Sequence, residues 1–162
     1  YTKSILEQIV FSHKNYSRYQ AISEINVVVG AGVTDYEELM MLSDSTKLKI
    51  SILSTPDSIS QLMLMSDLCI LSCGTMILEA CALGVPSIGI AVADNQQSTA
   101  RFLAKAGAIK LYDFKNEKGP DIYTEISSLI NDPKGLSVYS TKLKTMVSST
   151  SNETIARRLC GF

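Results

Sequence analysis

Short apolar runs alternate with amphipathic segments along this chain of 162 residues. Runs of β-branched and apolar residues between turn signals predict strands, and apolar residues at helical spacing predict helices. The predicted strands cover residues 25–29, 48–53, 68–71, 87–92 and 109–112. The predicted helices cover residues 3–20, 35–43, 55–65, the segment that holds Glu79 and stops at Gly84, then 94–105, 121–131, 136–147 and 152–160.

Strands therefore alternate with helices about every 20 residues, which is the signature of a parallel sheet covered on both faces. We predict an α/β fold with a doubly wound, mainly parallel, Rossmann-like sheet. We also expect residues 1–162 to form a single domain. In such sheets ligands bind beyond the carboxyl ends of the strands, near the point where the strand order reverses.

One acidic residue, Glu79, stands alone in the apolar stretch from Met76 to Leu83. A helix that is apolar on nearly every face is expected to be buried. A carboxylate in such a place costs several kcal/mol unless hydrogen bonds satisfy it. Glu79 is therefore expected either to pair with an internal donor or to face a cleft where a ligand supplies the hydrogen bonds.

The turn before that helix, Ser72-Cys73-Gly74-Thr75, has the composition of a phosphate site. Gly74 lets the backbone approach a ligand, and the unpaired N–H groups of a helix N-terminus attract anions. Thr75 and Glu79 are four residues apart and share one helical face. A phosphate at the turn would place Glu79 one turn away, where a ribose diol can donate to it. The alternative is that Gly74 only makes the turn and Glu79 binds a backbone or lysine donor.

A second polar turn, Asp94-Asn95-Gln96-Gln97, follows an apolar strand directly. Amide side chains both donate and accept hydrogen bonds, which suits sugar hydroxyls and uracil edges. The alternative is that Asp94 or Asn95 is a helix N-cap. Capping would account for one or two of the four residues, so we favour a mixed role.

Composition excludes several classes of function. Fifteen basic residues nearly balance sixteen acidic residues, so no basic field predicts nucleic acid or anionic lipid as a partner. The apolar runs are far shorter than the roughly 20 residues that span a bilayer. No metal is expected, because the four cysteines lack paired spacing and His13 is the only histidine. Buried, reduced thiols in a cytoplasmic protein are the expected state of the cysteines.

Several motifs together resemble the C-terminal half of UDP-sugar enzymes with the GT-B fold. The matching segments are Ser66–Ile70, Gly74-Thr75 with Glu79, Ala82–Ser87, Asp94–Gln96 and Leu103–Ala108. The likeness is greatest to the UDP-sugar hydrolases of pseudaminic acid biosynthesis, also known as spore-coat polysaccharide or flagellin-modification proteins, above all in the run Asn95–Ala100. The transferase that adds N-acetylglucosamine in peptidoglycan synthesis shares the Gly…Glu and Gly-x-Pro pattern.

The resemblance implies hydrolysis of a UDP-linked deoxy-acetamido sugar to the free sugar and UDP, without a metal or other cofactor. It places the ribose on Glu79, the phosphates on Ser72 to Thr75, and the sugar beside Asn95 and Gln96. The catalytic base of that family is a histidine of an N-terminal domain that this sequence lacks, so the catalytic residues are expected there and His13 does not inherit the role. We keep as a hypothesis that a helix within residues 148–162 packs across to that domain.

Two departures from the family pattern stand out. Ser72-Cys73-Gly74-Thr75 replaces the usual Gly-Gly or Gly-Ser pair before the helix. The family's domain also begins with a strand and a glycine-rich turn, whereas this chain begins at the helix that follows them, without an initiator methionine. We therefore interpret the chain as a piece of a longer protein. The absent strand would be central in a 3-2-1-4-5-6 order, which predicts an exposed or borrowed slot between strands 25–29 and 68–72.

Three functions are consistent with these features. The first is the UDP-sugar-binding half of a hydrolase in bacterial surface polysaccharide or flagellin glycan synthesis, inactive by itself. The second is half of a GT-B glycosyltransferase that uses a UDP-sugar donor. The third is a non-catalytic α/β interaction domain, in which Glu79 is satisfied internally and UDP does not bind.

Overall fold

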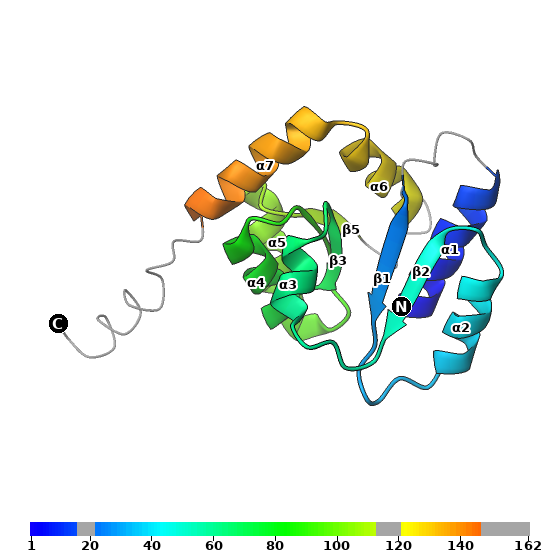
Figure 1. The fold of residues 1–162 in the computed structure, drawn as a ribbon. Coiled ribbons are helices and arrows are strands. Elements are labelled where there is room, and N and C mark those ends of the chain that lie inside the picture. Colours follow the sequence, from blue (N-terminus) through cyan, green and yellow to red (C-terminus); the bar gives the residue numbers. More distant parts are fainter. Residues whose placement is uncertain (16–21, 113–120, 147–162) are drawn as a thin grey trace. The chain divides into compact units, whose positions relative to one another are not determined.

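The computed structural model describes residues 1–15, 22–112 and 121–146, and Figure 1 traces them in chain order. The chain divides into two compact units, and the single domain expected over residues 1–162 stays a prediction. The first unit comprises Tyr1–Leu62 with Lys118–Asn131, and the second comprises Met63–Glu117 with Asp132–Phe162. Parallel strands and helices alternate within them, as the sequence predicts.

The first unit is built on two parallel strands, β1 (Glu24–Val28) and β2 (Lys49–Leu53). Two helices, α1 (Thr2–Asn15) and α2 (Tyr36–Asp44), lie on the same side of these strands (Figure 1). Their apolar stripes meet the β-branched residues of β1. The core of this unit consists of Leu6, Val10, Val27, Val29 and Leu39.

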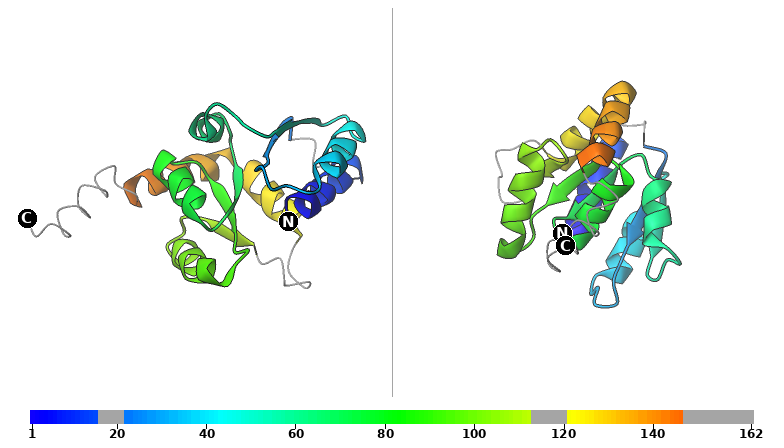
Figure 2. Two further views of the ribbon diagram at one scale, coloured as in Figure 1. Left: turned by 90° about the horizontal axis from the view of Figure 1, so that it is seen from below. Right: turned by 90° about the vertical axis from the view of Figure 1, so that its left-hand side faces the viewer.

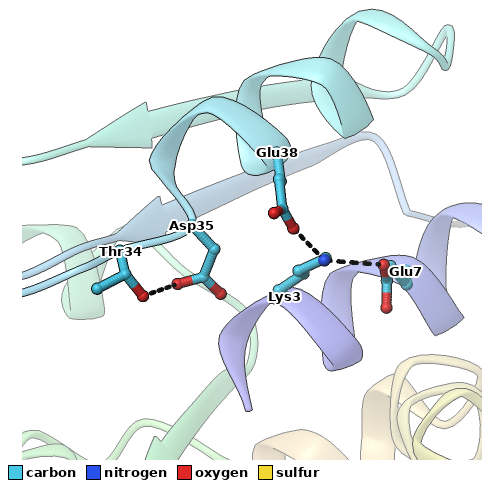
Figure 3. A network of polar contacts seen from close by, with 5 residues as sticks. All are labelled: Lys3, Glu7, Thr34, Asp35 and Glu38. Carbon is cyan, nitrogen blue, oxygen red and sulfur yellow. Dashed lines mark hydrogen bonds and ion pairs between the residues drawn. The ribbon is translucent and has the colours of Figure 1, made fainter.

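A network of charged and polar side chains joins the amino ends of α1 and α2 (Figure 3). Lys3 of α1 forms an ion pair with Glu38 in the first turn of α2, and lies 3.9 Å from Glu7. The hydrogen bond that Lys3 donates to the Glu38 carboxylate is the main cause that raises the pKa of Lys3. The Thr34 hydroxyl donates to Asp35 over 3.2 Å. Because these groups are solvated, each pair adds little stability by itself.

The second unit contains three parallel strands in the order β3 (Cys69–Ser72), β4 (Ser87–Ile90) and β5 (Lys110–Tyr112). The middle strand β4 is buried along its whole length. Helix α4 (Thr75–Leu83) connects β3 to β4, and α5 (Gln97–Lys105) connects β4 to β5. Helix α7 (Pro133–Met146) lies across α4 (Figures 1 and 2; Figure 2 gives two further views).

One apolar cluster fills the space between the sheet and these helices in the second unit. It is made of the buried side chains Cys73, Ile77, Cys81, Ala100, Leu103, Ala108, Ile109 and Leu143. Helix α4 stops at Gly84, which adopts a left-handed conformation with φ 73°, and the Val85 N–H donates to the Ala80 carbonyl over 2.9 Å. Glycine is favoured there because it has no Cβ to clash.

The strands fall into two separate sheets, β1-β2 and β3-β4-β5, among the residues that the structure describes. The expected slot of an absent central strand between residues 25–29 and 68–72 stays a prediction.

Two helix starts differ from the prediction. Helix α3 covers only Ile59–Leu64, because the Ser58 hydroxyl accepts from the Gln61 N–H over 3.2 Å and caps a later start than Thr55-Pro56. Helix α7 begins earlier than expected, where Asp132 accepts from the Gly135 N–H over 2.9 Å and Pro133 occupies the first turn. Helix α6 (Ile122–Ile130) is close to its expected range.

Some apolar side chains of these helices and the turns after them lie at the surface. Met40 is 40% exposed and Met65 is 84% exposed. Predicted segments 16–20, 147 and 152–160 lie outside the described residues. Within the described part, no helix has both the length and the apolarity needed to cross a bilayer.

Tyr139 of α7 yields a test of this packing. Its hydroxyl is buried without a hydrogen-bond partner among the described residues, and burial raises the pKa of its phenol. Tyr139→Phe removes an unsatisfied polar group, so the free energy of unfolding in urea should rise by about 1 kcal/mol. Tyr36→Phe is the control, because Tyr36 is 40% exposed and its change should have little effect. A clear loss of stability in Tyr139→Phe would reveal a partner for the hydroxyl.

Cys69 of β3 should make the stability of the fold depend on pH. Burial raises the pKa of its thiol from 9.0 to about 11. The unfolded chain therefore loses this proton first, so the stability that Cys69 contributes is complete below pH 9 and is lost as the pH rises toward 11. Urea unfolding across this interval should show a smaller decline for Cys69→Ala than for the parent chain. If the free energy of unfolding declines equally in both chains, the Cys69 thiol is not a cause of the pH dependence.

Candidate functional site

The two polar turns of interest lie at the same edge of the second unit's sheet. Strand β3 ends at Ser72 and β4 ends at Ile90, and the two strands are parallel. A Cβ atom on Gly74 would lie 3.7 Å from Gln96 Nε2 and 3.9 Å from the Ser72 hydroxyl. The structure therefore brings Ser72, Gly74 and Gln96 together at the start of α4, although 22 positions separate Gly74 from Gln96 in the sequence.

The first turn of α4 is open. Gly74 is its N-cap residue, and no side chain caps the helix. The N–H groups at a helix start carry a partial positive charge and have no partner within the helix. Because Gly74 has no side chain, an anion can approach these groups closely. The arrangement is chemically suited to a phosphate.

Cys73 turns inward rather than toward this opening. Its side chain is 2% exposed and belongs to the apolar cluster, and burial raises the pKa of its thiol. Its backbone N–H donates to the Ile90 carbonyl over 2.9 Å. Cys73 therefore has no polar side chain to offer a ligand, and it shapes the turn instead.

Glu79 is exposed, which corrects the expectation of a buried carboxylate. Helix α4 buries only one face, with Ile77, Ala80 and Cys81. Thr75 and Glu79 lie together on the other face, which is open to solvent. The error arose because apolar residues also occupy this outer face: Leu78 is 44% exposed. Water can hydrate the Glu79 carboxylate, so it requires no internal donor, and no described residue forms an ion pair with it.

The second turn is a short 3-10 helix, η2 (Asp94–Gln96), which leads into α5. Ala93 is the N-cap residue of η2 and Gln96 that of α5, and neither makes a side-chain capping bond. The alternative in which Asp94 or Asn95 caps the helix is therefore wrong. Both of these side chains are exposed.

Gln96 has a defined amide orientation. Its Oε1 accepts from the Val92 backbone N–H over 3.1 Å. A backbone N–H can only donate, so the oxygen must face Val92 and Nε2 must face the Gly74 side. Gln96 consequently presents a hydrogen-bond donor beside the open start of α4, and this donor complements an anion.

A different feature, which the sequence analysis missed, lies at the opposite edge of the same sheet. An open pocket of about 340 Å³ is lined by Ser66 and Asp67, which precede β3, by Leu83 to Pro86, which precede β4, and by the first half of α7. None of the predicted site residues lines it. No motif marks this pocket, because α7 forms one wall and is distant in sequence from the other walls.

Metal ligands do not gather in the described part of the chain, where no group of three His, Cys, Asp or Glu side chains could hold an ion. His13 lies on α1 of the first unit, whereas both polar turns belong to the second unit. The chemistry available at the two turns is therefore that of backbone N–H groups, hydroxyls, amides and the carboxylates of Glu79 and Asp94.

Comparisons with known proteins agree with this architecture. The model of a family described as "Glycosyltransferase family 28 C-terminal domain" matches residues 3–156. A crystal structure of Acinetobacter baumannii MurG is similar, with a TM-score of 0.74 and 18% sequence identity, over 99% of this chain and 48% of the MurG chain. The chain thus spans about half of that structure and has the Rossmann-like fold of a GT-B C-terminal half. No curated protein matches the chain.

The orientation of Gln96 can be tested with inorganic pyrophosphate, titrated into the ¹⁵N-labelled chain. Gln96→Glu keeps an acceptor for the Val92 N–H but replaces the donor beside Gly74 with a negative charge. This variant should bind pyrophosphate at least fivefold more weakly, and Gln96→Met, which adds no charge, should be less impaired. Equal affinities in all three chains would place the anion elsewhere.

Proposed function

We propose, because the chain belongs to the family of glycosyltransferase family 28 C-terminal domains, that it binds the nucleotide of a UDP-sugar at the carboxyl ends of β3 and β4. The observation that carries this proposal is the uncapped start of α4 with the Gln96 amide donor beside it. An apolar or cationic ligand would gain nothing from these groups, whereas a diphosphate is complementary to them.

In this arrangement the diphosphate lies against the turn from Ser72 to Thr75. Thr75 begins α4 and its side chain is exposed, so its N–H and its hydroxyl can both donate to a phosphate oxygen. Cys73 takes part through its backbone alone, because its thiol is buried.

Glu79 is four residues, about one helical turn, farther along the same face as Thr75, a rise of about 6 Å. Its exposed carboxylate can accept from both hydroxyls of a ribose. This role requires no buried charge: the ligand replaces water at an open carboxylate. Leu78, 44% exposed beside it, offers an apolar surface to the nucleoside.

Asn95 and Gln96 then line the side of the diphosphate that carries the sugar. In the reaction, the bond between the anomeric carbon and the β-phosphate oxygen breaks, and UDP leaves with a growing negative charge. The N–H groups of α4 and Gln96 Nε2 stabilise that charge. A water or acceptor hydroxyl forms the new bond and gives its proton to a base. We assign that base, and with it catalysis, to an N-terminal half that is not part of this chain.

Two fates of the sugar remain as candidates. Transfer to an acceptor is favoured by the family. Hydrolysis, as in pseudaminic acid synthesis for surface polysaccharide or flagellin glycans, is favoured by the resemblance of the run Asn95–Ala100. In a protein that contains both halves, release of free sugar without an acceptor would identify the hydrolase. A cytoplasmic location fits either activity, because Cys69, Cys73 and Cys81 are free thiols.

A titration series tests the nucleotide site. UDP should bind the chain, and Glu79→Ala should weaken binding by about 1–3 kcal/mol through loss of a charged hydrogen bond. The decisive comparison uses 2′-deoxy-UDP. It should bind the parent chain more weakly than UDP, but Glu79→Ala should no longer distinguish the two nucleotides.

Two controls complete this series. Glu37→Ala removes an exposed carboxylate from α2 of the first unit and should leave the affinity for UDP unchanged. Inorganic pyrophosphate should bind Glu79→Ala as well as it binds the parent chain, because it has no ribose. If millimolar UDP does not bind the parent chain, the non-catalytic interaction domain becomes the better description.

A further inference from the structure

We propose that Gly89, a buried residue of β4, is a positioning residue of the nucleotide site and acts through the Cys73 thiol. The identity of the ligand in this inference rests on the proposed function. The claim that Gly89 determines the position of the turn rests on the packing alone. Gly89 itself lies in the middle of the central strand and cannot touch a nucleotide.

The packing around Gly89 leaves no room for a side chain. A Cβ atom at this position would lie 2.8 Å from the Cys73 Sγ and 2.6 Å from the Ile109 Cδ1. Both separations are shorter than real Cβ contacts, so one of the partners must move if a methyl group is added. The missing side chain of Gly89 is therefore what lets the Cys73 thiol lie against the strand.

The turn that begins α4 is thus attached to β4 at two points. Cys73 donates its backbone N–H to the Ile90 carbonyl over 2.9 Å, and its thiol packs on the neighbouring Gly89. Gly74 and Thr75 follow immediately and carry the open N–H groups. Any displacement of Cys73 is transmitted through two peptide units to the groups that we assign to the diphosphate.

Cys73 also has little space into which it can retreat. It is 2% exposed and shares its cluster with Ile77 and Cys81, each 0% exposed. Interiors packed to this density respond to an added methyl group by shifting side chains and backbone. A methyl group at position 89 should therefore move the turn rather than be absorbed locally.

The second contact provides an internal control. Ile109 directly precedes β5, whose Leu111 is in register with Gly89, and it is not part of the turn at α4. A clash between a methyl group at position 89 and the Ile109 Cδ1 disturbs the packing of the core, but Ile109 itself carries none of the groups assigned to the ligand. Ile109→Val removes that atom, and Cys73→Ala removes the thiol, so the two clashes can be relieved separately.

The experiment compares the single variant Gly89→Ala with two double variants, in which Gly89→Ala is combined with Cys73→Ala or with Ile109→Val. The single variants Cys73→Ala and Ile109→Val are the references for the double variants. We measure the amide chemical shifts of residues 74–77, the affinity for UDP and the thermal midpoint. Gly89→Ala should displace these amide signals and weaken UDP binding at least fivefold. In the double variant with Cys73→Ala, the amide signals and the UDP affinity should equal those of Cys73→Ala alone. In the double variant with Ile109→Val, the thermal midpoint should be higher than that of Gly89→Ala, but the UDP affinity should stay as weak.

The inference is overturned if Gly89→Ala lowers the thermal midpoint while the amide signals and UDP affinity stay unchanged, or if Ile109→Val restores the affinity. If Gly89→Ala alone does not fold, the comparison moves to the Ile109→Val background, where only the thiol contact remains. If the parent chain binds no UDP, the proposed function fails, and the amide signals still decide whether Gly89 positions the turn.

Discussion

The close packing of β3 and the turn after it against β4 is the constraint on which the candidate site depends. The parallel arrangement places the ends of both strands at one edge. The hydrogen bond from Cys73 to Ile90 then fixes where the first strand stops and where α4 begins. Gly89 allows this approach because it has no side chain. The polar groups of two distant segments meet only because this apolar packing holds their backbones together.

The resulting site is an open one, and this affects its energetics. Glu79, Asn95 and Asp94 are exposed, so water competes with a ligand for each of them. Net gains from exposed hydrogen bonds are small, and a diphosphate held only by these groups would bind weakly. The helix start is an exception, because its N–H groups have no intrahelical partner. A second half that covers the site would exclude water and strengthen every one of these contacts.

The groups at the two turns account for binding of the nucleotide but not for the whole reaction. The described groups at the two turns can bind an anion, hold a diol and stabilise a leaving phosphate, and no histidine is among them. In the proposed function, recognition of the nucleotide and chemistry on the sugar belong to different halves. The family match describes the chain as a C-terminal domain, and the chain spans 48% of the similar MurG structure. Both findings are compatible with the proposed function, in which this chain binds the UDP-sugar donor and another half of the protein supplies the catalytic base.

The sequence by itself determined the features that depend on neighbouring residues. The alternation of elements, the stop at Gly84 and the placement of both polar turns after strands follow from local conformational preferences and hydrophobic periodicity. The tertiary structure decided the rest. It decided that Ser58 rather than Thr55 starts α3, that Glu79 faces water, that the Cys73 thiol faces the core and that Gln96 points its donor toward Gly74. These outcomes depend on which neighbour covers each face of an element. Periodicity cannot supply that information, because an apolar residue such as Leu78 has the same pattern whether or not anything packs against it.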